Sequence, residues 1–247
     1  MKVHRKIAKM FGYELIKRKK NPTAASHIIN LINHYHIDTI LDVGANQGQF
    51  GRMLREEEGY RKEIHSFEPV SRIFEHLQEN CLHDSRWFAY KRAMSDSCGE
   101  ALIHVSKSSD LSSFLTPNEF GKEKYKKIKI TEKEKVKLET IDTFIPQIIE
   151  NLDKRNTFLK MDTQGYDLKV FKGGLKSIQY FTFILSELSL TPIYSGMPHY
   201  LESLKIFEEY GFIISGLYPI SRKKDLSVVE MDCILLNKKI AAEMNHD

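Results

Sequence analysis

The stretch ILDVGANQGQF, residues 40–50, constrains the fold of this chain more than any other. Apolar residues typical of a buried strand run directly into Gly44 and Gly48, and a helix is expected to begin at Gln49 or Phe50. Glycine at both places permits a tight turn and lets backbone N–H groups approach a ligand, with the positive end of the helix facing the turn. The stretch therefore predicts a strand–turn–helix unit of an α/β fold, with a nucleotide-like cofactor at the turn.

The spacing of the two glycines narrows the kind of cofactor. Dinucleotide-binding enzymes carry G-x-G-x-x-G, in which the additional glycine admits a pyrophosphate, whereas this turn reads G-x-x-x-G. We therefore expect a cofactor without phosphate groups. A turn that serves only the packing of the strand against the helix is the alternative.

Strand-like and helix-like segments alternate along the chain, as in a parallel sheet covered by helices on both faces. The predicted strands are 39–43, 63–67, 87–93, 101–105, 136–138, 157–161, 181–188, 212–217 and 228–236. The predicted helices are 23–36, 49–58, 71–82, 168–173 and 200–210. The last two strands suit an antiparallel hairpin that finishes the sheet, and residues 106–135 are expected to form an insertion beside the active site.

The composition fits one globular domain. With 247 residues, 41% of them hydrophobic, the chain can bury the core of a domain over 38–247, preceded by an N-terminal helical extension over 1–37. No run of about eighteen apolar residues occurs and the N-terminus lacks a signal-type apolar core, so we expect a cytoplasmic protein without a transmembrane segment. Three widely spaced cysteines argue against a disulfide framework or structural zinc. The oligomeric state stays open, a homo-oligomer included.

The net charge of +4 is concentrated in two basic tracts, residues 2–20 and residues 121–137. In the second tract glutamates are interleaved with the lysines, and apolar residues alternate with polar ones as in a strand that is exposed on one face. The pattern predicts a solvated hairpin. Contact with phosphate or nucleic acid is the less favoured interpretation, because nucleic-acid surfaces usually combine lysine with arginine and aromatic residues.

Acidic residues stand at the ends of the first two predicted strands. Asp42 can order the glycine turn and attract a cationic amino-acid ligand, and Glu68 is placed to accept hydrogen bonds from both ribose hydroxyls of an adenosine. The adenine would lie near the end of the third strand, where Met94 either covers a ring face or belongs to the core. The expected cofactor-binding residues are Asp42, Gly44, Asn46, Gly48, Phe50, Glu68, Pro69, Ala93, Met94 and Asp162.

Six segments, taken in order, resemble the FkbM family of S-adenosylmethionine-dependent methyltransferases: DVGANQGQF, FEP, KRAMSDSCGEA, LETIDTF, FLKMDTQGYDLKVFKGG and ILSEL. The resemblance covers about residues 38–236. It implies the class I methyltransferase fold, a Rossmann-like α/β fold whose seven-stranded, mostly parallel sheet has the order 3-2-1-4-5-7-6 and helices on both faces. It also implies S-adenosylmethionine as the cofactor and methyl transfer to oxygen, commonly on sugars of surface glycans or on polyketide-type natural products. The family usually has Glu two residues after the fourth-strand Asp, where this chain has Gln164.

Ligands of open α/β sheets bind beyond the carboxyl ends of the strands, so the acceptor is expected at the ends of the fourth and fifth strands of such a sheet. Lys160 and Asp162 share one face of the strand there, and a lysine in an apolar strand is expected to pair with a carboxylate. Methyl transfer to an aliphatic hydroxyl needs a base or a metal. Asp162 is the first candidate to hold or deprotonate the hydroxyl and His199 is the second. Lys160 completes the expected catalytic residues.

The expected substrate-binding side chains come from three segments, and they are Ser112, Ser113, Gln164, Glu187, Tyr194 and Tyr200. The resemblance places the two serines close to the cofactor or the acceptor, although hydroxyls in a turn equally serve as partners of the local backbone. A divalent metal held by Asp162, Glu187 and His199 would be chemically sensible, but no compact metal-ligand motif supports it.

The expected function is that of an S-adenosylmethionine-dependent O-methyltransferase acting on a sugar hydroxyl, with a nucleotide-linked sugar or a surface-glycan precursor as the substrate. The carbohydrate substrate is what the resemblance implies. Two alternatives stay open: an O-methyltransferase of a polyketide-type natural product, and a non-catalytic S-adenosylmethionine-binding module, which Gln164 favours. No nucleic-acid partner is expected, because the strand ends in DTQG and not in the N/D-P-P-Y/F turn used for amino groups of bases.

Overall fold

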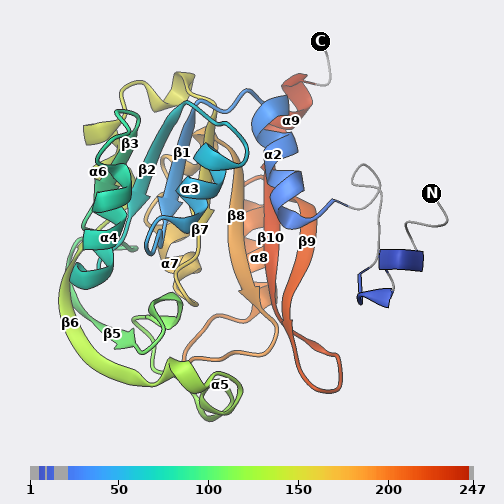
Figure 1. The fold of residues 1–247 in the computed structure, drawn as a ribbon. Helices are drawn as coiled ribbons and strands as arrows, with labels where there is room; N and C mark the ends of the chain where they lie inside the picture. Colours follow the sequence, from blue (N-terminus) through green and yellow to red (C-terminus); the bar gives the residue numbers. More distant parts are fainter. Residues whose placement is uncertain (1–5, 9, 14–21, 245–247) are drawn as a thin grey trace.

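A computed structural model describes residues 6–8, 10–13 and 22–244. In this part of the chain a central sheet is covered by helices on both faces (Figure 1). Much of the predicted N-terminal extension, including most of the basic tract 2–20, lies outside the described residues, so the extension stays a prediction. The helix expected at 23–36 is confirmed as α2 (Ala24–His34), which Thr23 caps by accepting a hydrogen bond from a backbone N–H.

Seven strands form the central sheet in the order β3-β2-β1-β7-β8-β10-β9. Counted along the chain within this sheet, the order is 3-2-1-4-5-7-6, as predicted, and the labels depart from it because three other strands form a separate sheet. All neighbours are parallel except β10, which is antiparallel to β8 and β9. The bounds are β1 (Thr39–Val43), β2 (Glu63–Phe67), β3 (Trp87–Tyr90), β7 (Thr157–Met161), β8 (Phe181–Ser189), β9 (Phe212–Arg222) and β10 (Val228–Asn237).

The core consists of two main apolar layers, one on each face of the central sheet. Alternate residues of a strand point to opposite faces, which explains why the buried strands read as continuous apolar runs. In β1, Leu41 packs in the layer that includes α6 (Ile141–Ile148), α7 (Asp167–Lys172) and α8 (Tyr200–Glu209). Ile40 packs in the opposite layer, which includes α2, α3 (Gln49–Glu56) and α4 (Ser71–Cys81).

A second, three-stranded sheet corrects two predictions. Its order is β4-β6-β5, with β4 (Ala93–Met94), β5 (Gly99–Ser106) and β6 (Ile130–Glu139). The predicted strand 87–93 is wrong as one strand, because β3 ends at Tyr90 and β4 pairs with β6 instead.

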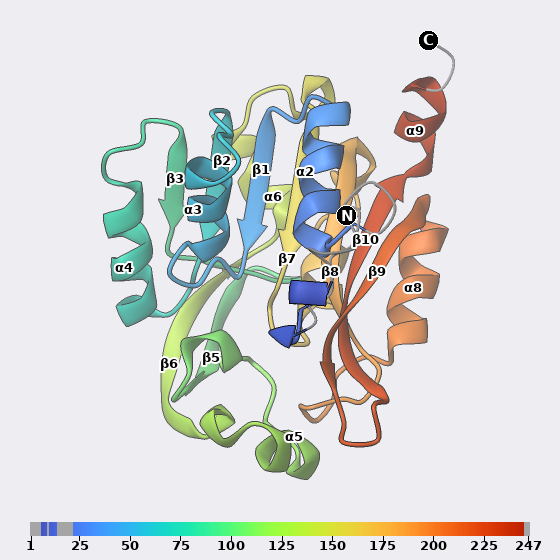
Figure 2. The same cartoon turned by 45° about the vertical axis from the view of Figure 1, so that its right-hand side comes forward.

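The predicted hairpin at 121–137 is also wrong. Its first part forms α5 (Glu119–Lys124) and a 3-10 turn, and its second part is β6, which pairs with the distant strand β5. Alternation of apolar and polar residues identified the strand, but it carries no information on the partner. The second sheet and α5 lie beyond the carboxyl ends of β1, β2 and β7 (Figures 1 and 2).

Besides α5, two further α-helices were not predicted. One is α6, which begins at a capping box formed by Thr140 and Thr143 and contains Pro146, a residue that usually ends a helix. The other is α9 (Lys238–Met244), which follows β10 directly. Short 3-10 turns complete the described elements: Ser109–Leu111, Lys126–Ile128, Leu152–Lys154 and Ile178–Tyr180. Of the helices in the described ranges, none has the length and apolar character needed to cross a membrane.

Candidate active site

A cavity of about 450 Å³ lies at the carboxyl ends of the central strands. Its volume is in the range of small-molecule sites. Residues at the ends of β1, β2, β7 and β8 form one side of it, and these include Gly44, Glu68, Asp162 and Glu187. The segment 109–114 and Tyr125 of the insertion, together with side chains of β9 and β10, complete the wall. The segment expected to be an insertion thus contributes residues to the cavity wall.

The glycine turn lies close to neighbouring parts of the protein as well as beside the cavity. Gly44 has a φ of +76°, and a Cβ added to it would lie 2.0 Å from the carbonyl oxygen of Asp162. Gly48 caps α3 with a φ of +84°, and a Cβ there would lie 3.0 Å from atoms of Leu77 and Trp87. Gly44 lines the cavity and Gly48 does not. The packing alternative thus accounts for Gly48, whereas Gly44 both packs against Asp162 and lines the cavity.

Glu68 is held in one orientation at the end of β2. Its carboxylate accepts hydrogen bonds from the backbone N–H of Asn46, at 3.1 Å, and from that of Val70, at 2.9 Å. Burial raises the pKa of Glu68 to about 7, against the opposing effect of these two donors. Each carboxylate oxygen can accept a further hydrogen bond, so Glu68 can bind a pair of hydroxyl groups in the cavity.

Lys160 lies beneath the cavity between two carboxylates. Its ammonium nitrogen is 3.0 Å from Oδ1 of Asp42 and 3.4 Å from Oδ2 of Asp162. Burial by itself would lower the pKa of Lys160, but the two carboxylates outweigh it and raise the pKa above its ordinary value. The lysine therefore stays protonated. It can orient Asp162 but cannot act as a base.

Asp162 is the carboxylate of this pair that reaches the cavity, with 44% of its side chain exposed. Its Oδ1 accepts a hydrogen bond of 3.4 Å from the side-chain amide of Gln164, whose Oε1 lies 3.2 Å from the Tyr194 hydroxyl. An amide can donate to one partner and accept from another at the same time, which a glutamate at this position could not do. Gln164 thus links Asp162 to the buried ring of Tyr194.

The wall beside Asp162 is acidic. Glu187 of β8 and Glu230 and Asp232 of β10 all line the cavity. Burial and the neighbouring carboxylates Asp162 and Glu230 raise the pKa of Glu187 well above its ordinary value. Burial, aided by Asp162 and opposed by Lys160, raises the pKa of Asp232 to about 6. Glu187 and Asp232 are therefore harder to ionise than the same groups in water.

Asp167 supports the acidic wall from behind. Its Oδ1 accepts hydrogen bonds from the backbone N–H and the hydroxyl of Thr163, at 2.8 Å and 2.5 Å. Its Oδ2 accepts from the Ser186 hydroxyl, at 3.0 Å, and from the Glu187 N–H, at 2.9 Å. A single buried side chain therefore fixes the turn after β7 against the end of β8.

Comparison with known protein families shows to which family the chain belongs. A family model described as the methyltransferase FkbM domain matches residues 42–214, which is more than two thirds of the chain and contains most of this cavity wall. The chain belongs to the FkbM methyltransferase family. Family and fold together imply S-adenosylmethionine as the methyl donor. A search of curated proteins finds no match.

Several solved structures are similar to this FkbM methyltransferase in fold. One is the methyltransferase FkbM of Methylobacillus flagellatus KT, with a TM-score of 0.48, 15% identity, and coverage of 80% of this chain and 43% of that one. Another is fibrillarin of Aeropyrum pernix with bound S-adenosylmethionine, with a TM-score of 0.43, 12% identity, and coverage of 81% and 66%. An rRNA methylase of Streptococcus thermophilus has a TM-score of 0.46, 8% identity, and coverage of 90% and 98%. This chain thus spans less than half of the Methylobacillus protein.

The structure brings most of the predicted residues of this FkbM methyltransferase into one cavity. Those that line it are Gly44, Asn46, Glu68, Pro69, Ala93, Met94, Ser112, Ser113, Asp162, Gln164 and Glu187. Met94 is also buried in the core, and its contact with an adenine ring stays a prediction. The Ser113 hydroxyl donates to the Gln164 carbonyl at 2.8 Å, and the Ser112 hydroxyl accepts from the Ser106 N–H at 3.1 Å, so both serve the local backbone as well.

Other predicted residues lie outside the cavity wall. Asp42 is fully buried against Lys160, and Phe50 packs edge-on against Phe158 with ring centroids 6.0 Å apart. Tyr200 packs on the core. In each case an apolar or charged partner inside the fold takes the place of the expected ligand.

The structure does not bring His199 to the cavity. Its ring nitrogen Nδ1 accepts a hydrogen bond from the Leu201 N–H and caps α8. Within the described ranges, no three His, Cys, Asp or Glu side chains are grouped so as to hold a metal ion. The set of Asp162, Glu187 and His199 is therefore not assembled as a metal site.

Several cavity residues were not predicted from the sequence. Glu230 and Asp232 carried a usable signal, because two acids at alternate positions in an apolar strand must share one face and be paired or functional. Asp167, which supports the wall without lining the cavity, stood inside the motif FLKMDTQGYDLKVFKGG without being singled out. Arg92, Asp110, Phe114, Tyr125, Tyr166 and Ile220 reach the cavity through loops and strand pairings that no local pattern specifies.

Proposed function

We propose that this chain is a cytoplasmic S-adenosylmethionine-dependent O-methyltransferase that acts on a hydroxyl of a sugar, carried by a nucleotide or by a surface-glycan precursor. The observation that supports it best is Asp162, a half-exposed carboxylate fixed between Lys160 and Gln164 at the floor of a cavity that also contains Glu68. Glu68 is suited to bind a ribose, and Asp162 is suited to bind an acceptor hydroxyl.

The residues present fit S-adenosylmethionine. Glu68 would accept hydrogen bonds from the two ribose hydroxyls, and the backbone of Gly44 at the turn lines the same cavity. Ala93 and Met94 offer an apolar surface for the adenine ring. When bound, the cofactor would supply a methyl group on a positively charged sulfur, and the sulfur would keep the electron pair of the broken carbon–sulfur bond.

Asp162 would hold the acceptor hydroxyl and accept its proton as the new carbon–oxygen bond forms. A positioned base is worth about 10²–10⁴-fold in rate. Lys160 contributes by keeping Asp162 oriented, and Gln164 contributes by fixing the other carboxylate oxygen. Gln164, which favoured a non-catalytic module in the sequence, is in this geometry a partner of the base.

The acidic wall supports a polyhydroxyl acceptor. Sugar hydroxyls donate well to carboxylates, and Asp232 and Glu187 stand in the same cavity as Asp162. The rings of Phe114 and Tyr166 also line it, 4.8 Å apart, and offer flat surfaces for the apolar faces of a sugar. A polyketide-type hydroxyl would use the same base but needs fewer hydrogen-bond acceptors.

The test combines binding and turnover. Calorimetry with S-adenosylmethionine and S-adenosylhomocysteine is followed by methyl-transfer assays on nucleotide sugars, glycan precursors and polyketide hydroxyls, with and without chelator. We expect micromolar cofactor binding, on the order of 8 kcal/mol, and transfer to a sugar hydroxyl. Asp162→Asn should lower kcat by about 10²–10⁴-fold and leave cofactor binding in place. The exposed Asp153→Asn is the matched control.

Three results would speak against the proposal. Cofactor binding without turnover on any acceptor favours the binding module. Transfer to a polyketide hydroxyl alone favours the second alternative. Full activity of Asp162→Asn removes the assigned base, and the next carboxylate to substitute would then be Asp232.

A further inference from the structure

A second cavity, of about 420 Å³, is built by the insertion beside the active site. Its lining is largely apolar and includes Pro117, Ile128 and Ile130. Three lysines complete the wall, Lys122, Lys126 and Lys129, and with Thr116 and Tyr125 they are its polar side chains. We refer to this hollow as the basic cavity. It combines an apolar floor with positive charge at its edge.

The charge of the basic cavity is not neutralised by the surrounding protein. Residues 107–137 contain nine lysines and five acidic residues, so their excess of four positive charges equals the net charge of the whole chain. Lys122 pairs with Glu119 at 2.7 Å on the surface. In the described part of the chain, no carboxylate lies within ion-pair distance of Lys126 or Lys129. Two ammonium groups are therefore available to an anion.

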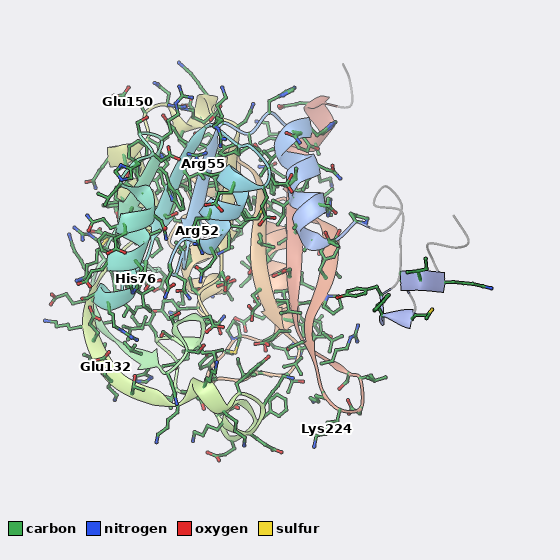
Figure 3. The ribbon with its side chains drawn as sticks, viewed as in Figure 1. Arg52, Arg55, His76, Glu132, Glu150 and Lys224 are labelled. Carbon is green, nitrogen blue, oxygen red and sulfur yellow. The ribbon has the colours of Figure 1, made fainter. Side chains whose placement is uncertain are left out.

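The basic cavity adjoins the active site through one side chain. Tyr125 lines both cavities, and its hydroxyl donates to Oε2 of Glu230 at 2.6 Å in the acidic wall. Lys124 donates to the carbonyl of Arg222 at 2.7 Å, which ties this part of the insertion to the β9–β10 hairpin. Figures 1 and 2 show α5 beside that hairpin, and Figure 3 labels Lys224 in its turn.

The two cavities have walls of opposite charge, and each wall therefore favours a different chemical group of a substrate. The acidic wall of Glu187, Glu230 and Asp232 repels a phosphate and suits neutral hydroxyls, whereas the basic cavity attracts a phosphate. We propose that the basic cavity binds the diphosphate group of the acceptor, while the sugar attached to that diphosphate extends past Tyr125 toward Asp162. This inference rests on the proposed function and names the part of the substrate that the insertion recognises.

The apolar floor indicates that the diphosphate continues into a ring or a hydrocarbon. A nucleoside and an isoprenoid carrier share the diphosphate and differ in this adjoining group. Ile128 and Ile130 with the Tyr125 ring offer contact to either one. Both candidate ligands carry the diphosphate. Probes with a nucleoside or with an isoprenoid chain distinguish between them.

Calorimetry on the full chain tests the proposal with inorganic pyrophosphate as the first probe. We expect saturable binding that weakens as NaCl is raised. The double variant Lys126→Gln/Lys129→Gln should lose about tenfold or more in affinity, since it removes two charged donors. The matched control Lys127→Gln/Lys133→Gln removes the same charge from exposed positions of the same tract that do not line the cavity, and it should lose less than about threefold.

Uridine diphosphate and geranyl diphosphate are the second and third probes. Tighter binding of either one than of pyrophosphate supports the proposal and names the source. Absence of saturable binding of all three probes overturns it, as does an equal loss in both double variants, which would mean that only the overall charge matters.

S-adenosylhomocysteine binding is measured on every variant and should be unchanged, because none of these lysines lines the active-site cavity. If the cofactor fails to bind while pyrophosphate binds with the expected lysine dependence, the proposed function fails and the anion site stands. If the cofactor binds and methyl transfer occurs without any diphosphate binding, the anion site fails alone.

Discussion

Nζ of Lys160 lies 3.0 Å from Oδ1 of Asp42, and the two residues are direct partners in the register of β7 and β1. Asp42 has no exposed surface, so its charge depends on this lysine and on the hydroxyl of Ser66, which donates to Oδ2 at 3.3 Å. Breaking such a pair from one side leaves an uncompensated buried charge. The pair therefore contributes to folding as well as to the orientation of Asp162.

Lys160→Met should lower the free energy of unfolding by about 3–5 kcal/mol at pH 7, because Asp42 would be left buried and unpaired. Urea denaturation measures the change. Lys133→Met on the exposed side of β6 is the control and should stay within about 0.5 kcal/mol. The double variant Asp42→Asn/Lys160→Met should recover much of the loss. A loss below about 1 kcal/mol for Lys160→Met would show that the pair is not the source of this stability.

Cofactor binding should release a proton from Glu68. Burial raises the pKa of Glu68 to about 7, and hydroxyl groups that donate to the carboxylate favour its charged form and lower the pKa again. Affinity for S-adenosylhomocysteine should therefore rise with pH up to about 7 and then level off. Calorimetry at pH 6.5, in buffers that differ in ionisation enthalpy, measures the protons released.

Glu68→Gln should abolish this release and weaken binding about tenfold or more, since the hydrogen bonds to a charged acceptor are lost. Glu63→Gln, at the opposite end of β2, is the matched control and should behave like the parent. Proton uptake on binding, or a release that persists in Glu68→Gln, would place the ribose elsewhere.

The local patterns of the sequence were enough to predict which strand ends form the candidate site. An apolar run that enters glycines identifies the end of β1, and parallel strands bring their carboxyl ends to one edge, so Gly44, Glu68 and Asp162 were expected together and line one cavity. The need of a buried lysine for a carboxylate partner was predictable from the cost of an unpaired charge, and Lys160 has two such partners.

The rest of the site depends on contacts that no local pattern encodes. Tyr125 reaches Glu230 across 105 positions of sequence, and β6 pairs with the distant strand β5, although alternation does not specify a strand's partner. His199 looked suitable because a loop histidine can reach a pocket, but the same imidazole also caps a helix, and the backbone of α8 decides between the two. Side-chain direction in loops is set by tertiary packing.

Gln164→Glu should restore the family's usual residue and destabilise this chain. The amide of Gln164 donates to Asp162 at 3.4 Å, and a carboxylate in its place would repel that side chain. The new carboxyl would have a raised pKa in the folded state, so stability should be lost as the pH rises above about 4.3.

The melting temperature at pH 5 and pH 8 measures the effect of Gln164→Glu. The melting temperature of the variant should fall further below that of the parent at pH 8 than at pH 5. At pH 8 the loss should correspond to about 1–2 kcal/mol in the free energy of unfolding. Gln147→Glu, exposed on α6, should show nearly the same small difference at both pH values. Equal differences for Gln164→Glu at pH 5 and pH 8 would mean that Asp162 and position 164 do not interact.

Glu187→Gln tests whether the acidic wall holds a proton at neutral pH. Burial, Asp162 and Glu230 raise the pKa of Glu187 well above its ordinary value, so its favourable contribution is complete below about pH 4.3 and is lost as the pH rises toward the folded-state pKa. The neutral amide has the shape of the protonated acid and does not titrate. The variant should therefore gain stability relative to the parent as the pH is raised.

Urea denaturation from pH 4.5 to pH 8.5 measures this gain, which should grow toward the alkaline end of the range. The exposed Glu209→Gln on α8 has no such neighbours and should follow the parent at every pH. If Glu187→Gln instead loses stability as the pH rises, Glu187 is ionised in the folded protein, and the wall offers an additional carboxylate that could accept the acceptor's proton in place of Asp162.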